Sequence, residues 1–170
     1  MLTRPKVLEI GCGEGATSIF LAKNGYDVTA FDLSSVAVQK TKAAAIKNDV
    51  ELNVFQADLN EFLPDESFDI IFSSGTLQYL YTNRKKIFIE TCQEKTTLNG
   101  INAFQTFVSK PFIPLAPDAE ASENLWSSGE LLLFYRDWMT ENFLEEIKPC
   151  NSSGVHHRHV HNRIWSRKIE

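Results

Sequence analysis

The stretch Val7–Asp32, VLEIGCGEGATSIFLAKNGYDVTAFD, decides the fold of this chain. A short apolar run ends in glycines at positions 11, 13 and 15, and a second apolar run ends at Asp32. Between a strand and a helix, glycine is favoured where φ must be positive or where a ligand leaves no room for Cβ. The following helix directs its unpaired N–H groups at that place. The stretch therefore predicts a strand–loop–helix–strand unit for a nucleotide-like ligand, with Asp32 accepting hydrogen bonds from ribose hydroxyls.

Strand-like and helix-like segments alternate over the first two-thirds of the sequence. Alternation of this kind is typical of a parallel, doubly wound sheet. After position 108 it stops, and a proline-containing loop, a short helix and a closing antiparallel strand pair are expected. The predicted fold is a single α/β domain over 1–170, Rossmann-like, with a mostly parallel seven-stranded sheet that ends in an antiparallel pair. The expected strands are 6–10, 27–31, 51–56, 68–74, 100–108, 139–147 and 155–168; the expected helices are 15–24, 34–48, 83–95 and 129–138; the expected loop is 109–128.

Composition excludes several classes of protein. The chain has 170 residues, 43% of them hydrophobic and 23% charged, as expected of one globular domain. Its formal net charge of −5 argues against a nucleic-acid partner, because counterion release needs a basic face. No apolar run approaches the roughly 20 residues that span a membrane, so no membrane partner is expected. Three cysteines without a C-x-x-C spacing indicate reduced thiols and a cytoplasmic location.

Two kinds of ligand fit the glycine pattern. Gly11-x-Gly13-x-x-Ala16 satisfies the dinucleotide fingerprint, although a single match of this kind is weak. The acid-x-G-x-G-x-G pattern of Glu9, Gly11, Gly13 and Gly15 resembles instead the first motif of class I S-adenosylmethionine-dependent methyltransferases. A nicotinamide-dependent oxidoreductase and a non-catalytic adenosylmethionine-binding module stay open as alternatives.

More of the chain resembles the methyltransferases. FQADLNEF puts Asp58 directly after the third strand, where the family's acidic residue meets the adenine amino group. FDIIFSSGTLQYL resembles the fourth-strand motif, which holds the methionine portion of the cofactor. LAKNGYDVTAFDLS, GELLLFYRDW and HRHVHNRIWSRK are similar to the tellurite-resistance methyltransferase group and its small relatives. The resemblance implies transfer of a methyl group to a small acceptor, such as tellurite, another oxyanion or a small metabolite.

The resemblance also implies a set of residues that contact S-adenosylmethionine. They follow the first four strands, where a doubly wound sheet holds its ligand. The implied cofactor-binding residues are Glu9, Gly11, Cys12, Gly13, Gly15, Asp32, Leu33, Asp58, Leu59, Ser73 and Ser74.

All four histidines lie in the run HHRHVH near the end of the sequence. On a strand, His157, His159, His161 and Arg163 share one face and Arg158 points the opposite way. Alternate histidines can bind a metal, but no carboxylate lies nearby in sequence to orient a ring, so no metal is expected. The resemblance places a His-Arg pair beside the acceptor and implies catalytic roles for His157, Arg158 and Arg163. Histidine can deprotonate a protic acceptor, and the guanidinium fork can hold an oxyanion.

The start of the sequence departs from the family pattern. Most class I methyltransferases have one or two helices before the first strand that cover the cofactor, whereas five residues precede Lys6 here. We expect these helices to be absent: either the chain is shortened, or the site is covered by the 109–128 loop or by the other subunit of a homodimer. Tyr79, Tyr81, Tyr135 and Trp138 either line the acceptor side or, as aromatic helix residues more often do, pack on the sheet.

Overall fold

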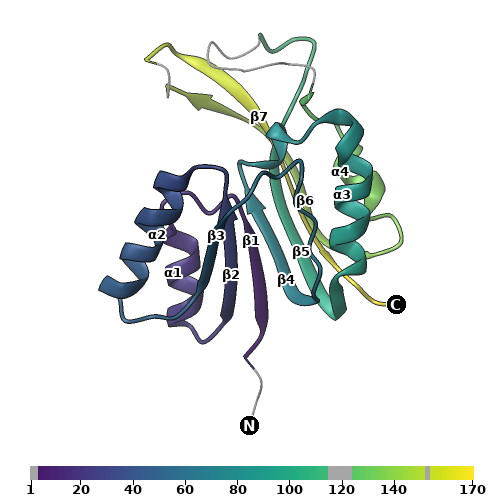
Figure 1. The fold of residues 1–170 in the computed structure, drawn as a ribbon. Coiled ribbons are helices and arrows are strands. Elements are labelled where there is room, and N and C mark those ends of the chain that lie inside the picture. Colours follow the sequence, from purple (N-terminus) through teal and green to yellow (C-terminus); the bar gives the residue numbers. More distant parts are fainter. Residues whose placement is uncertain (1–3, 115–123, 152–153) are drawn as a thin grey trace.

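A computed structural model describes residues 4–114, 124–151 and 154–170 of the chain. It has one seven-stranded sheet, in the order β3-β2-β1-β4-β5-β7-β6, with α1 and α2 on one face and α3 and α4 on the other (Figure 1). The elements are β1 (Lys6–Ile10), α1 (Ala16–Lys23), β2 (Asp27–Asp32), α2 (Ser35–Lys47), β3 (Asn53–Gln56), β4 (Phe68–Ser74), η1 (Leu77–Tyr79), α3 (Thr82–Glu94), β5 (Thr96–Val108), α4 (Glu130–Phe134), β6 (Met139–Cys150) and β7 (His157–Arg167).

The sheet is mixed, as the sequence predicts. The first five strands pair in parallel, so their carboxyl ends lie along one edge. The last two strands run the opposite way to their neighbours: β7 pairs antiparallel with β5 on one side and with β6 on the other. The predicted α/β fold with a closing antiparallel pair is confirmed, and β7 starts at the edge where the parallel strands end.

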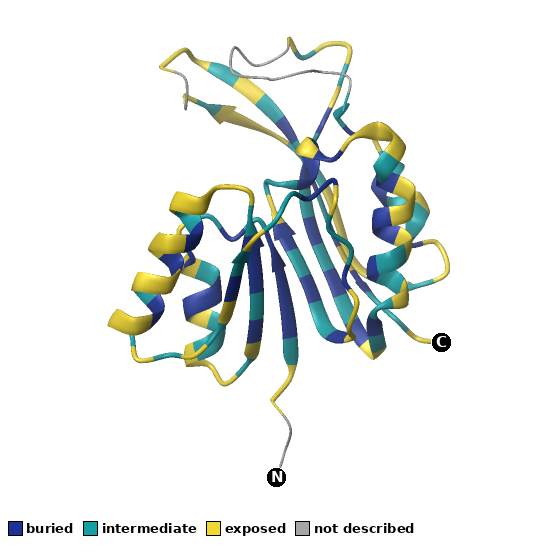
Figure 2. Cartoon of the chain, in the orientation of Figure 1, coloured by how far each residue is buried: buried dark blue, intermediate teal, exposed yellow. Residues whose placement is uncertain are grey.

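Two apolar clusters hold the helices against the sheet. The central strand β1 is buried along most of its length, whereas β4 and β5 alternate between buried and half-buried residues, as Figure 2 shows in dark blue and teal. Helices therefore cover β1 on both faces and bury one face of its neighbours more fully than the other. The larger cluster includes Phe31, Phe88 and Trp126, and the smaller one includes Val28 and Val38. Among the described residues, no helix is both long enough and apolar enough to cross a lipid bilayer.

Three predicted boundaries are wrong by three residues or more. β5 begins at Thr96, four residues early, because the ladder with β4 shifts register between Phe68 and Ile70 and so takes up the extra residues. The helix after Gly129 ends at Phe134 instead of continuing to position 138. β6 extends to Cys150 through a proline, because β6 is an edge strand and one of its sides needs no ladder hydrogen bonds.

The described part of the expected 109–128 loop is fixed to the core at Trp126. Its backbone bridges to Val108, and its buried indole Nε1 donates to the Leu77 carbonyl over 2.9 Å. The Lys85 ammonium lies 4.6 Å from the indole ring centroid and 3.2 Å from a Glu130 carboxylate oxygen. This end of the segment is therefore part of the core. Residues 115–123, which include much of the expected cover, lie outside the described residues.

Candidate functional site

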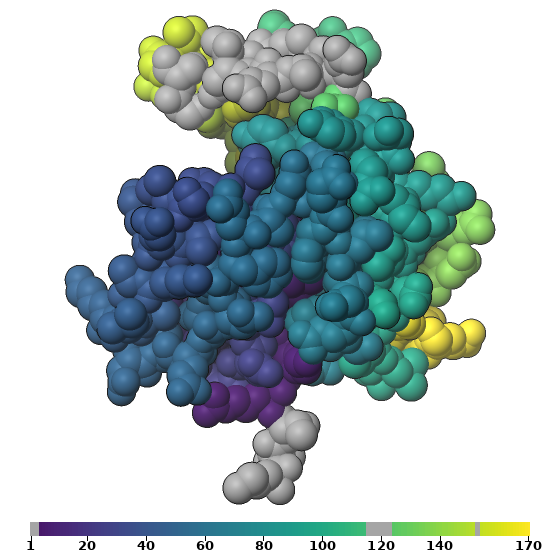
Figure 3. Space-filling model, viewed as in Figure 1, coloured from purple at the N-terminus to yellow at the C-terminus, as the bar shows by residue number. Residues whose placement is uncertain are grey.

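A cavity of about 850 Å³ opens at the carboxyl ends of the parallel strands. Figure 3 shows the yellow-green end of the β6–β7 hairpin beyond this edge of the molecule. Doubly wound sheets bind ligands at this edge, and the volume is that of a small-molecule site. The described residues that line it are Gly11, Gly13, Phe31, Asp32, Leu33, Ser34, Ala57, Asp58, Leu59, Asn60, Ser74, Gly75, Thr76, Gln78, Tyr79, Tyr81 and Asn124.

The glycine loop between β1 and α1 forms one wall. All three glycines have positive φ, at 75° for Gly11, 54° for Gly13 and 81° for Gly15. A Cβ on Gly11 would lie 2.0 Å from Oγ1 of Thr76, and one on Gly15 would lie 2.5 Å from Thr41. A Cβ on Gly13 would meet no atom within 4 Å. Packing and backbone conformation both require glycine at 11 and 15, whereas at 13 the backbone conformation alone requires it, beside open space in the cavity.

Asp32 ends β2 and joins the glycine loop to the next helix. Its Oδ2 accepts a hydrogen bond from the Gly13 N–H and its Oδ1 accepts one from the Ser34 N–H, each over 2.9 Å. Ser34 in turn caps α2 by accepting from the Ala37 N–H. The carboxylate therefore lies in the cavity wall at a fixed position. Each oxygen also has a second lone pair for a ligand hydroxyl.

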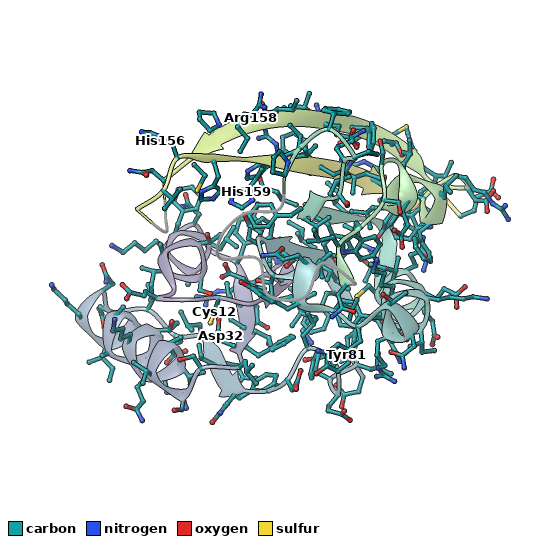
Figure 4. The ribbon with its side chains drawn as sticks, turned by 90° about the horizontal axis from the view of Figure 1, so that it is seen from above. Cys12, Asp32, Tyr81, His156, Arg158 and His159 are labelled. Carbon is teal, nitrogen blue, oxygen red and sulfur yellow. The ribbon has the colours of Figure 1, made fainter. Side chains whose placement is uncertain are left out.

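Asn60 holds the opposite wall together. Its buried side chain donates from Nδ2 to the Tyr79 carbonyl over 3.2 Å and accepts at Oδ1 from the Tyr81 N–H over 2.8 Å. Asp58 forms the Asx turn that positions it, accepting from the Asn60 N–H over 2.8 Å. The Tyr79 and Tyr81 side chains are 58% and 54% exposed, so neither packs in the core. Figure 4 shows Tyr81 on the same side of the molecule as Asp32.

Four of the residues implied as cofactor contacts lie behind the wall. Buried Glu9 accepts a hydrogen bond from the Ser18 hydroxyl, and burial raises the pKa of its carboxyl. Burial also raises the pKa of the Cys12 thiol to about 11, so this thiol is not a nucleophile at neutral pH. Ser73 donates to the Ile10 carbonyl over 3.0 Å, and Gly15 packs on Thr41. The implied contacts that do line the cavity are Gly11, Gly13, Asp32, Leu33, Asp58, Leu59 and Ser74.

Sequence reasoning missed part of the lining. The clearest local signal was the run Ser-Gly-Thr after β4, in which Gly75 has a φ of 72° and Thr76 packs against Gly11. Asn60 and Asn124 carry no such signal, because their partners come from segments distant in sequence. The missed lining residues are Phe31, Ser34, Ala57, Asn60, Gly75, Thr76, Gln78 and Asn124.

The residues implied for catalysis lie on the β6–β7 hairpin, which rises above the carboxyl edge of the sheet (Figure 1). None of them is among the described residues that line the cavity. Arg163 is ion-paired with Glu146, and Lys148 and Arg163 together lower the pKa of that carboxyl. Figure 4 shows Arg158 and His159 on opposite sides of β7, with His159 toward Cys12 and Asp32. Arg158 is therefore on the other face from His157 and Arg163.

Known proteins share this sequence pattern and this fold. The chain is 29% identical over 140 residues to the probable S-adenosyl-L-methionine-dependent methyltransferase TehB of Haemophilus influenzae (strain 10810), which covers 82% of this chain and 47% of the relative. It is 31% identical over 116 residues to the ubiquinone biosynthesis O-methyltransferase of Pasteurella multocida (strain Pm70), which covers 62% and 47%. The chain spans about half the length of these curated relatives.

Solved structures share the fold. TehB from Haemophilus influenzae matches with a TM-score of 0.87 at 24% identity, over 98% of this chain and 58% of that chain. A SAM-dependent methyltransferase from Methanosarcina mazei matches with a TM-score of 0.71 at 17% identity, over 99% and 94%. The family model described as "Tellurite resistance protein TehB" matches residues 1–164. The predicted resemblance to the tellurite-resistance group is confirmed: the chain belongs to the TehB family.

Proposed function

We propose that this chain binds S-adenosylmethionine in the cavity and transfers its methyl group to a small acceptor. The observation that carries the proposal is Asp32, whose carboxylate is fixed at the end of β2 beside the glycine loop and lines the cavity. A carboxylate in this place is suited to a pair of ribose hydroxyls. The names of the relatives supply the choice of S-adenosylmethionine over other nucleotides.

The other walls fit the remaining parts of this cofactor. Asp58 and Asn60 offer polar groups at the end of β3, beside the apolar side chains of Phe31 and Leu59, which suits an adenine ring with its amino group. Ser74 ends β4 on the other side of the glycine loop, which suits the methionine portion. Bound there, the cofactor supplies an electrophilic methyl group on a sulfonium. The chain contributes the positions of the two reactants and the exclusion of competing water.

We propose a small acceptor, with an oxyanion such as tellurite as the first candidate. The family description names tellurite resistance, and the net charge of −5 disfavours a nucleic-acid acceptor. His157 and Arg163 share one face of β7 with His159, whose side Figure 4 shows toward Cys12 and Asp32; we call this the inner face, and the two are the proposed acceptor-side residues. Arg158, which lies on the opposite, outer face of β7, is also proposed to act on the acceptor. We also propose that the protein is cytoplasmic and that it forms a homodimer in which the second subunit covers the cavity.

Calorimetry with S-adenosylmethionine, its demethylated product and NADH tests the cofactor. We expect both sulfur compounds to bind and NADH not to bind. Asp32→Ala should cost about 1 to 3 kcal/mol of binding free energy, because a fixed acceptor for two hydroxyls is lost. Asp27→Ala is the matched control, since Asp27 is exposed at the other end of the same strand.

The alternatives give different results in the same experiments. Binding of NADH without S-adenosylmethionine would indicate an oxidoreductase and contradict the proposal. Firm binding of S-adenosylmethionine without turnover of oxyanion, thiol or hydroxylated acceptors would indicate a binding module. Equal affinities of wild type and Asp32→Ala would show that the carboxylate does not hold the ribose.

A further inference from the structure

Three side chains with metal-binding atoms meet where the β6–β7 hairpin turns. Cys150 ends β6 directly opposite His157, the first residue of β7, and His159 lies two residues further on the same face. The Cys150 Sγ and one ring nitrogen from each histidine all lie within 4.8 Å of one another. We propose that Cys150, His157 and His159 form a zinc-binding site.

The two ring nitrogens are spaced much as in a tetrahedral zinc site, and the sulfur lies within 4.8 Å of both. The Nε2 atoms of His157 and His159 share a hydrogen bond over 2.9 Å, and a bound ion would take the place of the proton between them. With Zn–N of about 2.0 Å and Zn–S of about 2.3 Å, tetrahedral ligand atoms lie about 3.3 to 3.5 Å from one another. Small rotations of the side chains therefore bring all three atoms to bonding distance. Each residue is partly exposed, so an ion can reach them from solvent.

Neighbouring groups orient both rings for this role. The Nδ1 atom of His157 is 2.7 Å from the Val155 carbonyl oxygen, which can only accept, so Nδ1 carries the proton and Nε2 presents its lone pair to the cluster. The ring of His159 stacks on Phe107 with centroids 4.5 Å apart and planes 9° apart. Zinc-binding histidines in proteins are held in this way, by a hydrogen bond at the second nitrogen and by packing.

The set of donor atoms selects the kind of ion. A thiolate with two neutral imidazoles suits zinc, whereas calcium and magnesium prefer oxygen ligands. Lys148 lies opposite His159 across the two strands, but Glu146 pairs with its ammonium at 2.9 Å and offsets its charge. Three protein ligands leave a fourth position for water or an anionic ligand. The hairpin face that carries the ion is the one Figure 4 shows toward Cys12 and Asp32.

A zinc site that includes Cys150 replaces the expected absence of a metal, which was based on the histidines alone. Zinc binding at the hairpin is independent of methyl transfer and is measured without cofactor or acceptor. It does change one residue's role, since a His157 that coordinates zinc through Nε2 does not take a proton from the acceptor. In the zinc-loaded protein, the fourth position is where an anionic ligand meets this face.

The test is a titration of the metal-free full chain with Zn²⁺ in competition with a chromophoric chelator, and with Co²⁺ as a spectroscopic probe. We expect one ion per chain and a thiolate-to-cobalt charge-transfer band. Cys150→Ser should abolish that band, and Cys150→Ser and His159→Gln should each weaken zinc binding by at least about 100-fold, the upper range for loss of a residue that only supports a ligand. His156→Gln, an exposed neighbour outside the cluster, should leave the affinity unchanged.

Three results would overturn the site. They are wild-type zinc binding too weak to compete with the chelator, affinities in Cys150→Ser and His159→Gln equal to that of the wild type, and a loss in His156→Gln as large as in His159→Gln. Circular dichroism and S-adenosylmethionine calorimetry on the same variants report folding and the cavity separately. Loss of zinc with both of these intact therefore concerns the hairpin alone.

Discussion

The cavity wall and the tip of the β6–β7 hairpin are held together in different ways. In the wall, Asp32 and Asn60 bond mainly to backbone groups, namely the N–H groups of Gly13 and Tyr81 among others. At the tip, side chains from two strands meet each other, as Cys150 and His157 do. A wall built on backbone positions depends on the loop conformation that Asp32 and Asn60 hold. A side-chain cluster depends on strand register, and one residue of slip removes it.

The largest expected effect is the loss of stability when a glycine of the loop is replaced. Gly11→Ala should destabilise the protein by at least about 3 kcal/mol, because the new Cβ collides with the whole Thr76 side chain at a positive φ. Gly13→Ala should cost about 1 to 2 kcal/mol, since its φ of 54° is strained but its surroundings are empty. Urea unfolding of the two variants measures the difference. Equal losses would show that contact with Thr76 does not set the loop.

A second experiment removes the link that holds the other wall. Asn60→Ala leaves the Tyr81 N–H and the Tyr79 carbonyl without their side-chain partner, which should lower stability by about 1 to 3 kcal/mol. Cofactor affinity should fall with it, because both tyrosines line the cavity. Asn48→Ala is the control, since Asn48 bonds to Ala44 and Lys23, neither of which lines the cavity. Unfolding curves and calorimetry that cannot tell the two variants apart would contradict the role of Asn60.

The pH dependence of stability tests the role of Glu9, which is buried behind the cavity wall. Burial raises the pKa of Glu9 above its ordinary value of 4.5, so the folded protein holds a proton that the unfolded chain has released. Stability therefore falls as pH rises from about 4.5 through the raised pKa. Glu9→Gln should remove this decline in a series of thermal melts from about pH 4 to about pH 7.

Glu14 affects the pH dependence of stability in the opposite direction. Its carboxylate pairs with Lys40, which lowers its pKa, so its small contribution is present at neutral pH and is lost as pH falls. Glu14→Gln should therefore leave the decline at rising pH in place. A Glu9→Gln protein with the wild-type pH profile would show that the Glu9 carboxyl is not the group responsible.

The smallest effect on stability is expected at the hairpin. Arg163→Ala removes a partly exposed ion pair with Glu146 and should cost less than about 1 kcal/mol. If the inner face of β7 meets the acceptor, the same change should lower kcat/KM for an oxyanion about tenfold or more, with cofactor affinity unchanged. Arg158→Ala, on the outer face, should affect kcat/KM less. An equal loss in both variants would contradict the assignment of faces.

The two regions also differ in what the sequence predicts. Strand ends and glycine spacing place Gly11, Asp32 and Asp58 at one edge, because the parallel fold brings consecutive strand ends together. Asn60 could not be predicted, since its partners belong to a loop that only the folded chain brings near. At the hairpin, Pro149 indicated that the strand had already ended, yet an edge strand accommodates it. Because the strand was predicted to end at position 147, the pairing of Cys150 with His157 was not predicted.

The strand order has a consequence for synthesis on the ribosome. β7 lies between β5 and β6, although β6 leaves the exit tunnel first. Until 157–167 has emerged, β6 lacks its one strand partner in the sheet and the 13 residues of β5 expose one edge. That edge carries buried-type residues such as Phe104 and Val108, a combination that favours association between nascent chains. The sheet is completed by insertion of its last-made strand, so a chain that stalls before His157 is the form most in need of a chaperone.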